Sequence, residues 1–135
     1  MTEYRIGDRT EVVPIIVKRE DVFAFVKALG DNQQIFYDVE AAKTAGFNDI
    51  LLPLTYPTIF WQSIPIPWLD NQTIVQVDQA FHYQRPLTAN TEYDCYIELK
   101  NIQKLRNHIF LKHCLFISDC ARSETTVMIQ GEEGL

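Results

Sequence analysis

The side chains best suited to moving protons are Asp31, which follows Gly30 at the end of a helical pattern, and the three histidines His82, His108 and His113. Imidazole titrates near neutral pH, so a histidine beside a carboxylate can carry out general acid–base catalysis. His82, on a long strand pattern, is the best candidate to assist Asp31. The alternatives are structural: Asp31 can cap a turn through its own backbone, and each histidine can be a core or surface residue.

A second group of candidates surrounds an apolar stretch from Thr55 to Ser63, which predicts a helix. The Thr55 hydroxyl can cap its start, and Pro57 falls in the first turn, where a missing N–H costs nothing. The helix is apolar nearly all round, which predicts burial. The aromatic side chains of Phe60, Trp61 and Trp68 can line a tunnel for an apolar chain, and packing in the core or in a dimer contact is the alternative.

Length and composition indicate one globular domain covering residues 1–135. Hydrophobic residues make up 47% of the chain and charged residues 22%, which excludes a disordered protein. The net charge is −6 and no basic run is longer than two residues, so nothing favours nucleic acid or an anionic membrane as a partner. The four cations Arg5, Arg9, Lys18 and Arg19 form a local basic patch or scattered surface charge.

The three cysteines, Cys95, Cys114 and Cys120, have no zinc-site spacing and cannot all pair in disulfides. Cys95 and Cys114 lie in apolar strand patterns, which favours buried thiols in a reducing compartment. The polar N-terminus has no signal-peptide core, and the apolar run at residues 50–54 is too short to cross a bilayer. We therefore expect a cytoplasmic protein.

Secondary-structure patterns place helices early and strands late. Helices are expected at residues 20–29, with Gly30 as a left-handed cap, and at residues 38–45, with Asp38 as N-cap. Strands are expected at residues 11–17, 73–85, 91–103, 107–119 and 122–130. Pro14 favours an edge position for the first strand, and apolar residues on both faces favour a central position for residues 107–119. Short connections favour antiparallel neighbours.

Two stretches resemble MaoC-like (R)-enoyl hydratases and dehydratases. Residues 25–57 contain the helix that ends in Gly-Asp, and residues 81–87 read Phe-His-Tyr-Gln-Arg-Pro-Leu, which is similar to a strand end of the N-terminal, FAS1-like dehydratase domain. That family often has Gly-Asp after Arg-Pro-Leu; here Asn90-Thr91 stands there, and asparagine tolerates the left-handed turn. The resemblance implies an α+β hotdog fold, in which about five antiparallel strands wrap a central apolar helix. The strand and helix patterns favour the same arrangement.

The resemblance also implies which residues act. The family uses an Asp and a His on a segment that overhangs the substrate channel, and backbone N–H groups at the start of the central helix polarise the thioester carbonyl. Asp31 matches the Asp, Gln33 replaces the motif Asn, and Phe36 replaces the His. Asp31 acting alone would lose about two to four orders of magnitude in rate. The substrate-binding candidates are Gln33, Phe36, Thr55, Tyr56 and Phe60.

Three functions remain open. The first is an acyl-binding, catalytically incomplete dehydratase or hydratase subunit for 3-hydroxyacyl or enoyl thioesters of CoA or acyl carrier protein, in a homodimer or a heterodimer with a second MaoC-like hotdog chain. The second is a self-sufficient hydratase homodimer that uses Asp31 with His82. The third is an acyl-CoA thioesterase or ligand-binding module, which the lack of a carboxylate in residues 55–63 disfavours. None of the three requires a cofactor or a metal.

Overall fold

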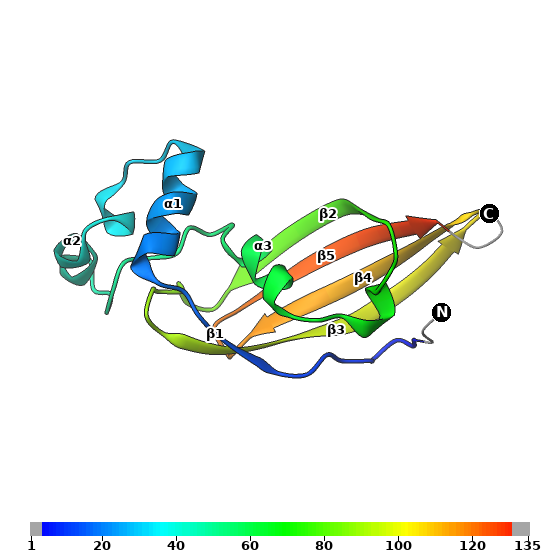
Figure 1. Cartoon of the computed structure of the whole chain (residues 1–135). Helices are drawn as coiled ribbons and strands as arrows, with labels where there is room; N and C mark the ends of the chain where they lie inside the picture. Colours follow the sequence, from blue (N-terminus) through cyan, green and yellow to red (C-terminus); the bar gives the residue numbers. More distant parts are fainter. Residues whose placement is uncertain (1–3, 131–135) are drawn as a thin grey trace.

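Five antiparallel strands form one sheet in the order β1-β3-β4-β5-β2 (Figure 1). The computed structural model describes residues 4–130. The strands are Val13–Ile16 (β1), Ile74–Tyr83 (β2), Glu92–Leu105 (β3), His108–Ile117 (β4) and Ala121–Gln130 (β5). All five were predicted within a few residues. Short turns join β3 to β4 and β4 to β5, so these strands pair in sequence, and β4 occupies the central position that its apolar faces predicted.

Alternation of side chains fixes which face of the sheet is buried. In β3 the residues Tyr93, Cys95, Ile97 and Leu99 are buried, and the residues between them face outward. β1 is a short edge strand that contains Pro14, as the proline predicted. Asn90 has φ 58°, so the turn before β3 is left-handed at the expected residue.

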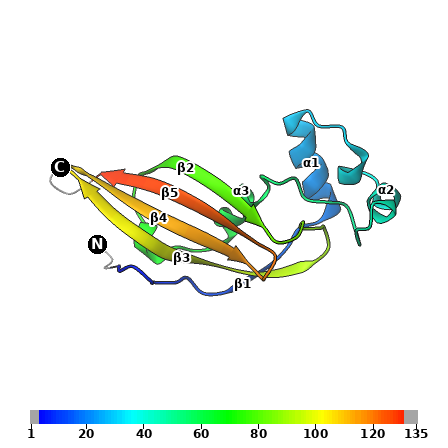
Figure 2. The ribbon, with the colours of Figure 1, turned by 180° about the vertical axis from the view of Figure 1, so that it is seen from behind.

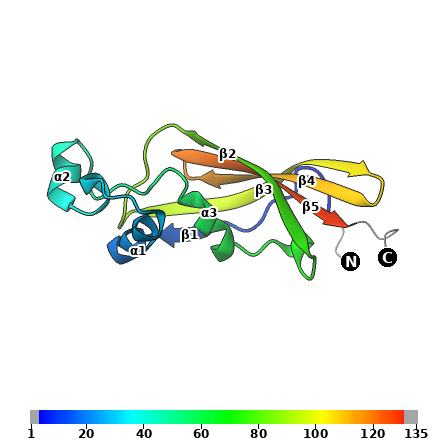
Figure 3. The ribbon, with the colours of Figure 1, turned by 90° about the horizontal axis from the view of Figure 1, so that it is seen from above.

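Two helices lie at one end of the sheet (Figures 1 and 3). Helix α1 spans Arg19–Leu29 and ends at Gly30, whose φ of 75° is left-handed. Helix α2 spans Val39–Thr44, and the Asp38 carboxylate accepts the N–H groups of Glu40 and Ala41 as its N-cap. Both helices and both caps confirm the sequence prediction, and the last residue of α1, Leu29, is exposed.

The central helix is shorter and more exposed than predicted. Helix α3 is a single turn, Pro57–Phe60, and two 3-10 turns follow it: η2 (Trp61–Ser63) and η3 (Pro67–Leu69). No side chain caps α3, so the predicted cap by Thr55 is wrong. Thr58, Gln62 and Ser63 are exposed, which contradicts burial all round. Prolines at 65 and 67 prevent regular helix, and one side of this central segment, residues 55–69, faces solvent.

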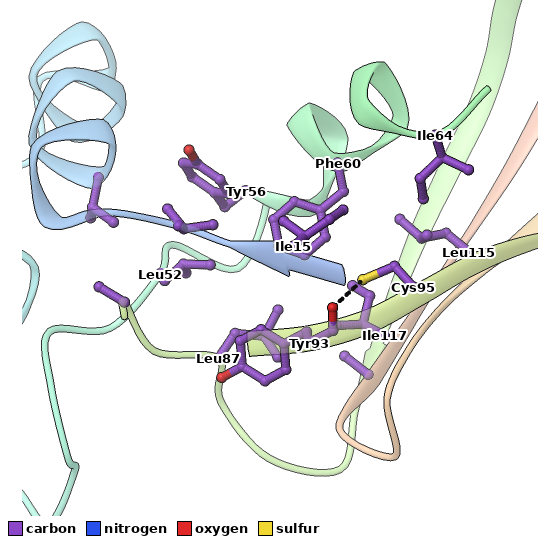
Figure 4. Packing of buried hydrophobic residues seen from close by; sticks show 14 of the residues in the cluster. Ile15, Leu52, Tyr56, Phe60, Ile64, Leu87, Tyr93, Cys95, Leu115 and Ile117 are labelled. Carbon is purple, nitrogen blue, oxygen red and sulfur yellow. Dashed lines mark hydrogen bonds between the residues drawn. The ribbon is translucent and has the colours of Figure 1, made fainter. Parts of the chain in front are cut away.

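The central segment covers one face of the sheet, and Figure 2 shows the opposite face uncovered. The main core lies under α3 and between β1, β3 and α1. Figure 4 labels ten of its residues, including Ile15, Tyr56 and Phe60. A second cluster fills the other end of the sheet, where Trp68 packs on Leu99, Leu111, Val127 and Ile129. The apolar central segment therefore packs on the inner face of the sheet, which is the arrangement of a hotdog fold.

Candidate functional site

The loop after α1 holds the motif aspartate in a turn. The Asp31 carboxylate accepts the backbone N–H of Gln33 at 2.9 Å and the Gln33 side-chain amide at 3.4 Å. The Tyr37 hydroxyl donates to the Asp31 carbonyl at 2.7 Å. These bonds fix the loop and give Asp31 the turn-capping role that was the alternative to catalysis.

Phe36 ends the 3-10 turn η1 (Gln34–Phe36) and is half-buried against the main core. The neighbouring ring of Tyr37 stacks on Phe23 of α1, with ring centroids 5.9 Å apart. The residue that replaces the motif histidine therefore contributes to packing, and a phenyl ring has no proton to transfer. Gln33 is exposed in the same loop.

A cleft of about 510 Å³ lies between β1, α1 and the central segment. Its apolar walls are Ile15, Val17, Phe25, Ile59 and Phe60. Ligand-binding pockets usually fall between about 300 and 1,000 Å³ and have mostly apolar walls, so this cleft has the size and character of one. Of the substrate-binding candidates, Tyr56 and Phe60 line it, and Gln33, Phe36 and Thr55 are not among its lining residues. The catalytic candidate Asp31 is not among them either.

Three polar side chains reach this cleft: Asp21, Tyr56 and Ser63. Burial, reinforced by the charge of Asp21, raises the pKa of Tyr56 above its usual value, so its hydroxyl stays protonated at neutral pH. Sequence analysis missed Asp21. The signal was present, because Asp21, Ala24 and Phe25 follow the spacing of one helix face.

The histidine candidate lies elsewhere. His82 is exposed on β2, and its Nε2 is 3.1 Å from a carboxylate oxygen of Glu124 on β5. It lines a separate hollow of about 490 Å³ with Arg122 and Asp119. Asp31 and His82 make their side-chain hydrogen bonds to different partners, Gln33 and Glu124.

The other two histidines also have structural or surface positions. His108 is exposed at the start of β4. His113 is fully buried, stacks on Trp68 at 5.9 Å, and accepts the Trp68 indole N–H at its Nε2 at 2.9 Å. Burial lowers the pKa of His113 to about 4, so the imidazole is neutral at physiological pH.

Two of the four cations suggested as a basic patch form ion pairs. Arg19 binds Asp49 through two hydrogen bonds of 2.9 and 2.8 Å, and Arg9 binds Glu98 at 2.9 Å. The guanidinium of Arg19 lowers the pKa of Asp49, which also accepts the Ile50 N–H. Asp49 thereby connects the start of α1 to the loop before the central segment, a contact between residues 30 positions apart that has no local signal in the sequence.

Comparison with known proteins identifies the family. The model of the FAS1-like dehydratase domain region matches residues 5–111. The chain belongs to this family. A UPF0336 protein of Parafrankia sp. (strain EAN1pec) is 35% identical over 113 residues, which are 76% of this chain and 73% of that protein. The resemblance predicted from residues 25–57 and 81–87 is confirmed.

Solved structures confirm the hotdog fold of this FAS1-like chain. A chain of the C-terminally truncated HadBC (3R-hydroxyacyl-ACP dehydratase) complex of Mycobacterium tuberculosis superposes with a TM-score of 0.81 at 22% identity, covering 95% of this chain and 99% of that one. A MaoC-like dehydratase superposes with a TM-score of 0.85 at 21% identity, covering 96% of this chain and 43% of that one. One hotdog unit thus matches less than half of the longer MaoC-like chain.

Two further properties concern residues 4–130. In that range no helix is long and apolar enough to cross a membrane. Over the same residues, no three His, Cys, Asp or Glu side chains cluster in a way that could hold a metal ion.

Proposed function

We propose that this chain is the acyl-binding, catalytically incomplete subunit of a MaoC-like dehydratase or hydratase for 3-hydroxyacyl or enoyl thioesters of CoA or acyl carrier protein. The observation that carries the proposal is at position 36. There a phenylalanine packs against the core in place of an imidazole, while the hotdog scaffold and an apolar cleft are retained.

The loss of the imidazole matters because the reaction needs an acid–base pair. Hydration of an enoyl thioester, or its reversal, needs a base for the α-proton and an acid for the β-hydroxyl. The Asp31 carboxylate accepts a hydrogen bond from Gln33, and the His82 ring forms a hydrogen bond with Glu124. The hydrogen bonds of these two residues go to other groups, which supports a second chain as the source of the acid–base pair.

The cleft supports the acyl-binding half of the proposal. Its walls of Ile15, Val17, Phe25, Ile59 and Phe60 can take an alkyl chain out of water, at about 0.8 kcal/mol for each CH₂ group buried. Tyr56, at the start of α3, places a hydroxyl donor at the same site, where a thioester or hydroxyl oxygen can accept it.

The β2 edge supports a partner chain. β2 is ten residues long and exposes Ile74, Val75 and Val77, whereas β1 at the other edge has four residues and a proline. An exposed apolar edge strand readily pairs with another strand. We propose that a second MaoC-like hotdog chain, identical or different, pairs along β2; the HadBC relative is itself described as a complex.

The cysteines support a cytoplasmic location for this subunit. All three are free thiols, and Cys95 and Cys114 are buried. Burial raises the pKa of Cys95 to about 12 and that of Cys114 to about 11, so neither forms the reactive thiolate. Buried unpaired thiols are typical of proteins from reducing compartments.

The test separates binding from catalysis. Purified chain is titrated calorimetrically with a saturated acyl-CoA and assayed for loss of enoyl-CoA absorbance. We expect binding without hydration above the Asp31→Asn background. Ile59→Gln, which places an amide in the cleft wall, should weaken binding about tenfold or more, because it opposes burial of the chain. Thr58→Gln, at the adjacent exposed position, is the control and should leave affinity unchanged.

Two outcomes would reject the proposal. Vigorous hydration by the pure chain that Asp31→Asn abolishes would establish the self-sufficient hydratase instead. Release of free thiol from acyl-CoA would establish a thioesterase.

A further inference from the structure

The charge on the described walls of the cleft is negative. Among the described residues, 4–130, that line it, Asp21 is the one charged side chain, and none is a lysine, arginine or histidine. The cationic residues nearest to Asp21 along the chain are Lys18 and Arg19, and Arg19 forms an ion pair with Asp49. A ligand that enters this cleft therefore meets a carboxylate with no lining cation to offset it.

A backbone hydrogen bond orients this carboxylate, which is exposed to solvent at the cleft. Asp21 is the third residue of α1, and its Oδ2 accepts the backbone N–H of Lys18 at 3.3 Å in a capping box. Across the cleft, the Tyr56 ring is 5% exposed, and Figure 4 shows its oxygen turned away from the core and toward α1. Asp21 and Tyr56 both line the cleft, and the charge of Asp21 adds to the effect of burial in raising the pKa of Tyr56.

We propose that Asp21 and Tyr56 make the cleft selective for an uncharged chain with a hydroxyl or amide, and against a free fatty carboxylate. An ionised carboxylate only accepts hydrogen bonds, whereas a tyrosine hydroxyl donates one and accepts another. A ligand hydroxyl satisfies both groups, because its proton goes to Asp21 while its oxygen accepts from Tyr56. A ligand carboxylate has no proton for Asp21 and is repelled by it.

This specificity rests on the proposed acyl-binding function and narrows it. The cleft accepts the esterified or hydroxylated chain and excludes the free acid that thioester hydrolysis would release. Selection comes from repulsion of the wrong ligand as much as from attraction of the right one.

The test compares two probes of equal chain length, 1-dodecanol and dodecanoate, by displacement of a fluorescent apolar dye at neutral pH. The wild type should bind dodecanol on the order of tenfold more tightly than dodecanoate, and added salt should narrow the difference. Asp21→Asn keeps an oxygen for the Lys18 N–H, so α1 is retained. This variant should tighten dodecanoate binding and reduce the preference to about threefold or less.

Glu20→Gln is the matched control, because it removes the same charge from the adjacent, exposed residue of α1, which is not part of the cleft. It should keep the wild-type preference. Equal affinity of the wild type for both probes, or an equal response of the two variants, overturns the charge selection but leaves acyl binding standing. Binding of neither probe overturns the acyl-binding function as well.

Discussion

Asp31 makes a hydrogen bond that contributes to the turn after α1. Its carboxylate accepts the Gln33 N–H in the turn that follows α1, and it does not line the cleft. Asp31→Ala removes this acceptor and should lower the free energy of unfolding by about 1 kcal/mol. Asp31→Asn keeps an acceptor oxygen and should cost less than half as much. Urea unfolding measures both; equal losses would show that the charge, and not the turn, matters.

Acyl-CoA affinity provides a second measurement on these two variants. Because Asp31 lies outside the cleft walls, neither substitution should change affinity by more than about twofold. A loss of tenfold or more would place Asp31 in the binding site.

His113 makes stability depend on pH. Its pKa is lowered to about 4 by burial, whereas an unfolded histidine titrates near 6.5. The unfolded chain therefore binds more protons in this window, and stability present above about pH 6.5 is lost as the pH falls toward 4. The expected loss is on the order of 3 kcal/mol. Urea unfolding at several pH values across this window measures it.

His113→Gln removes the titrating group but keeps an acceptor for the Trp68 indole. It should be less stable at neutral pH, because the ring packing with Trp68 is lost, and its stability should fall less steeply with acid. His108→Gln, at an exposed position, is the control and should retain the wild-type slope. If the free energy of unfolding fell equally steeply with acid in the wild type and in His113→Gln, His113 would not be the group that causes the pH dependence.

Sequence reasoning located only part of the site. Tyr56 was named because the family resemblance places the substrate at the start of the central helix, and Phe60 because its aromatic ring could line a tunnel. Thr55 was wrong as a cap because α3 begins two residues later, at Pro57. Asp21 shares a helix face with Ala24 and Phe25, but it was missed because an acidic residue in a first helical turn is already explained by the helix dipole.

At the scale of elements, the end of α1 sets the direction of the loop that carries Asp31. Gly30 has φ 75°, and a Cβ built there would meet no atom within 4 Å. The cost of Gly30→Ala is therefore backbone strain alone, about 1 kcal/mol. Gly30→Asn should cost about half as much, because asparagine tolerates this conformation better. Thermal unfolding of the two variants compares them; equal destabilisation would indicate a steric cause instead.

The elements with local signals were predictable, and the central segment was not. Helix α2 has an Asp N-cap and the strands have strict alternation, so local chemistry determines them. The stretch from Thr55 to Ser63 also looked like one buried helix by composition. Its observed form, one α turn followed by 3-10 turns, depends on prolines at 65 and 67 and on Trp68 docking against His113. That docking joins residues 45 positions apart and has no local signature.

At the scale of the whole molecule, the two edges of the sheet differ. The β1 edge is short and contains Pro14, and the central segment and α1 pack near it. The β2 edge is long, carries exposed valines and has a register shift between Gln76 and Asp78. A strand edge of this kind can pair with its own copy about a two-fold axis, or with a related chain. We therefore expect the purified chain to sediment as a dimer.

A charge on the β2 edge tests this assembly. Val75 is 53% exposed on β2, and Val12, next to β1 on the opposite edge, is 58% exposed. Val75→Lys should shift sedimentation toward the monomer, because a pair of lysines at a two-fold edge contact repels and remains hydrated. Val12→Lys makes the same change in charge at a matched exposure and should leave the dimer intact. A dimer in both variants would exclude the β2 edge, and a monomer in both would mean that added charge acts without regard to position.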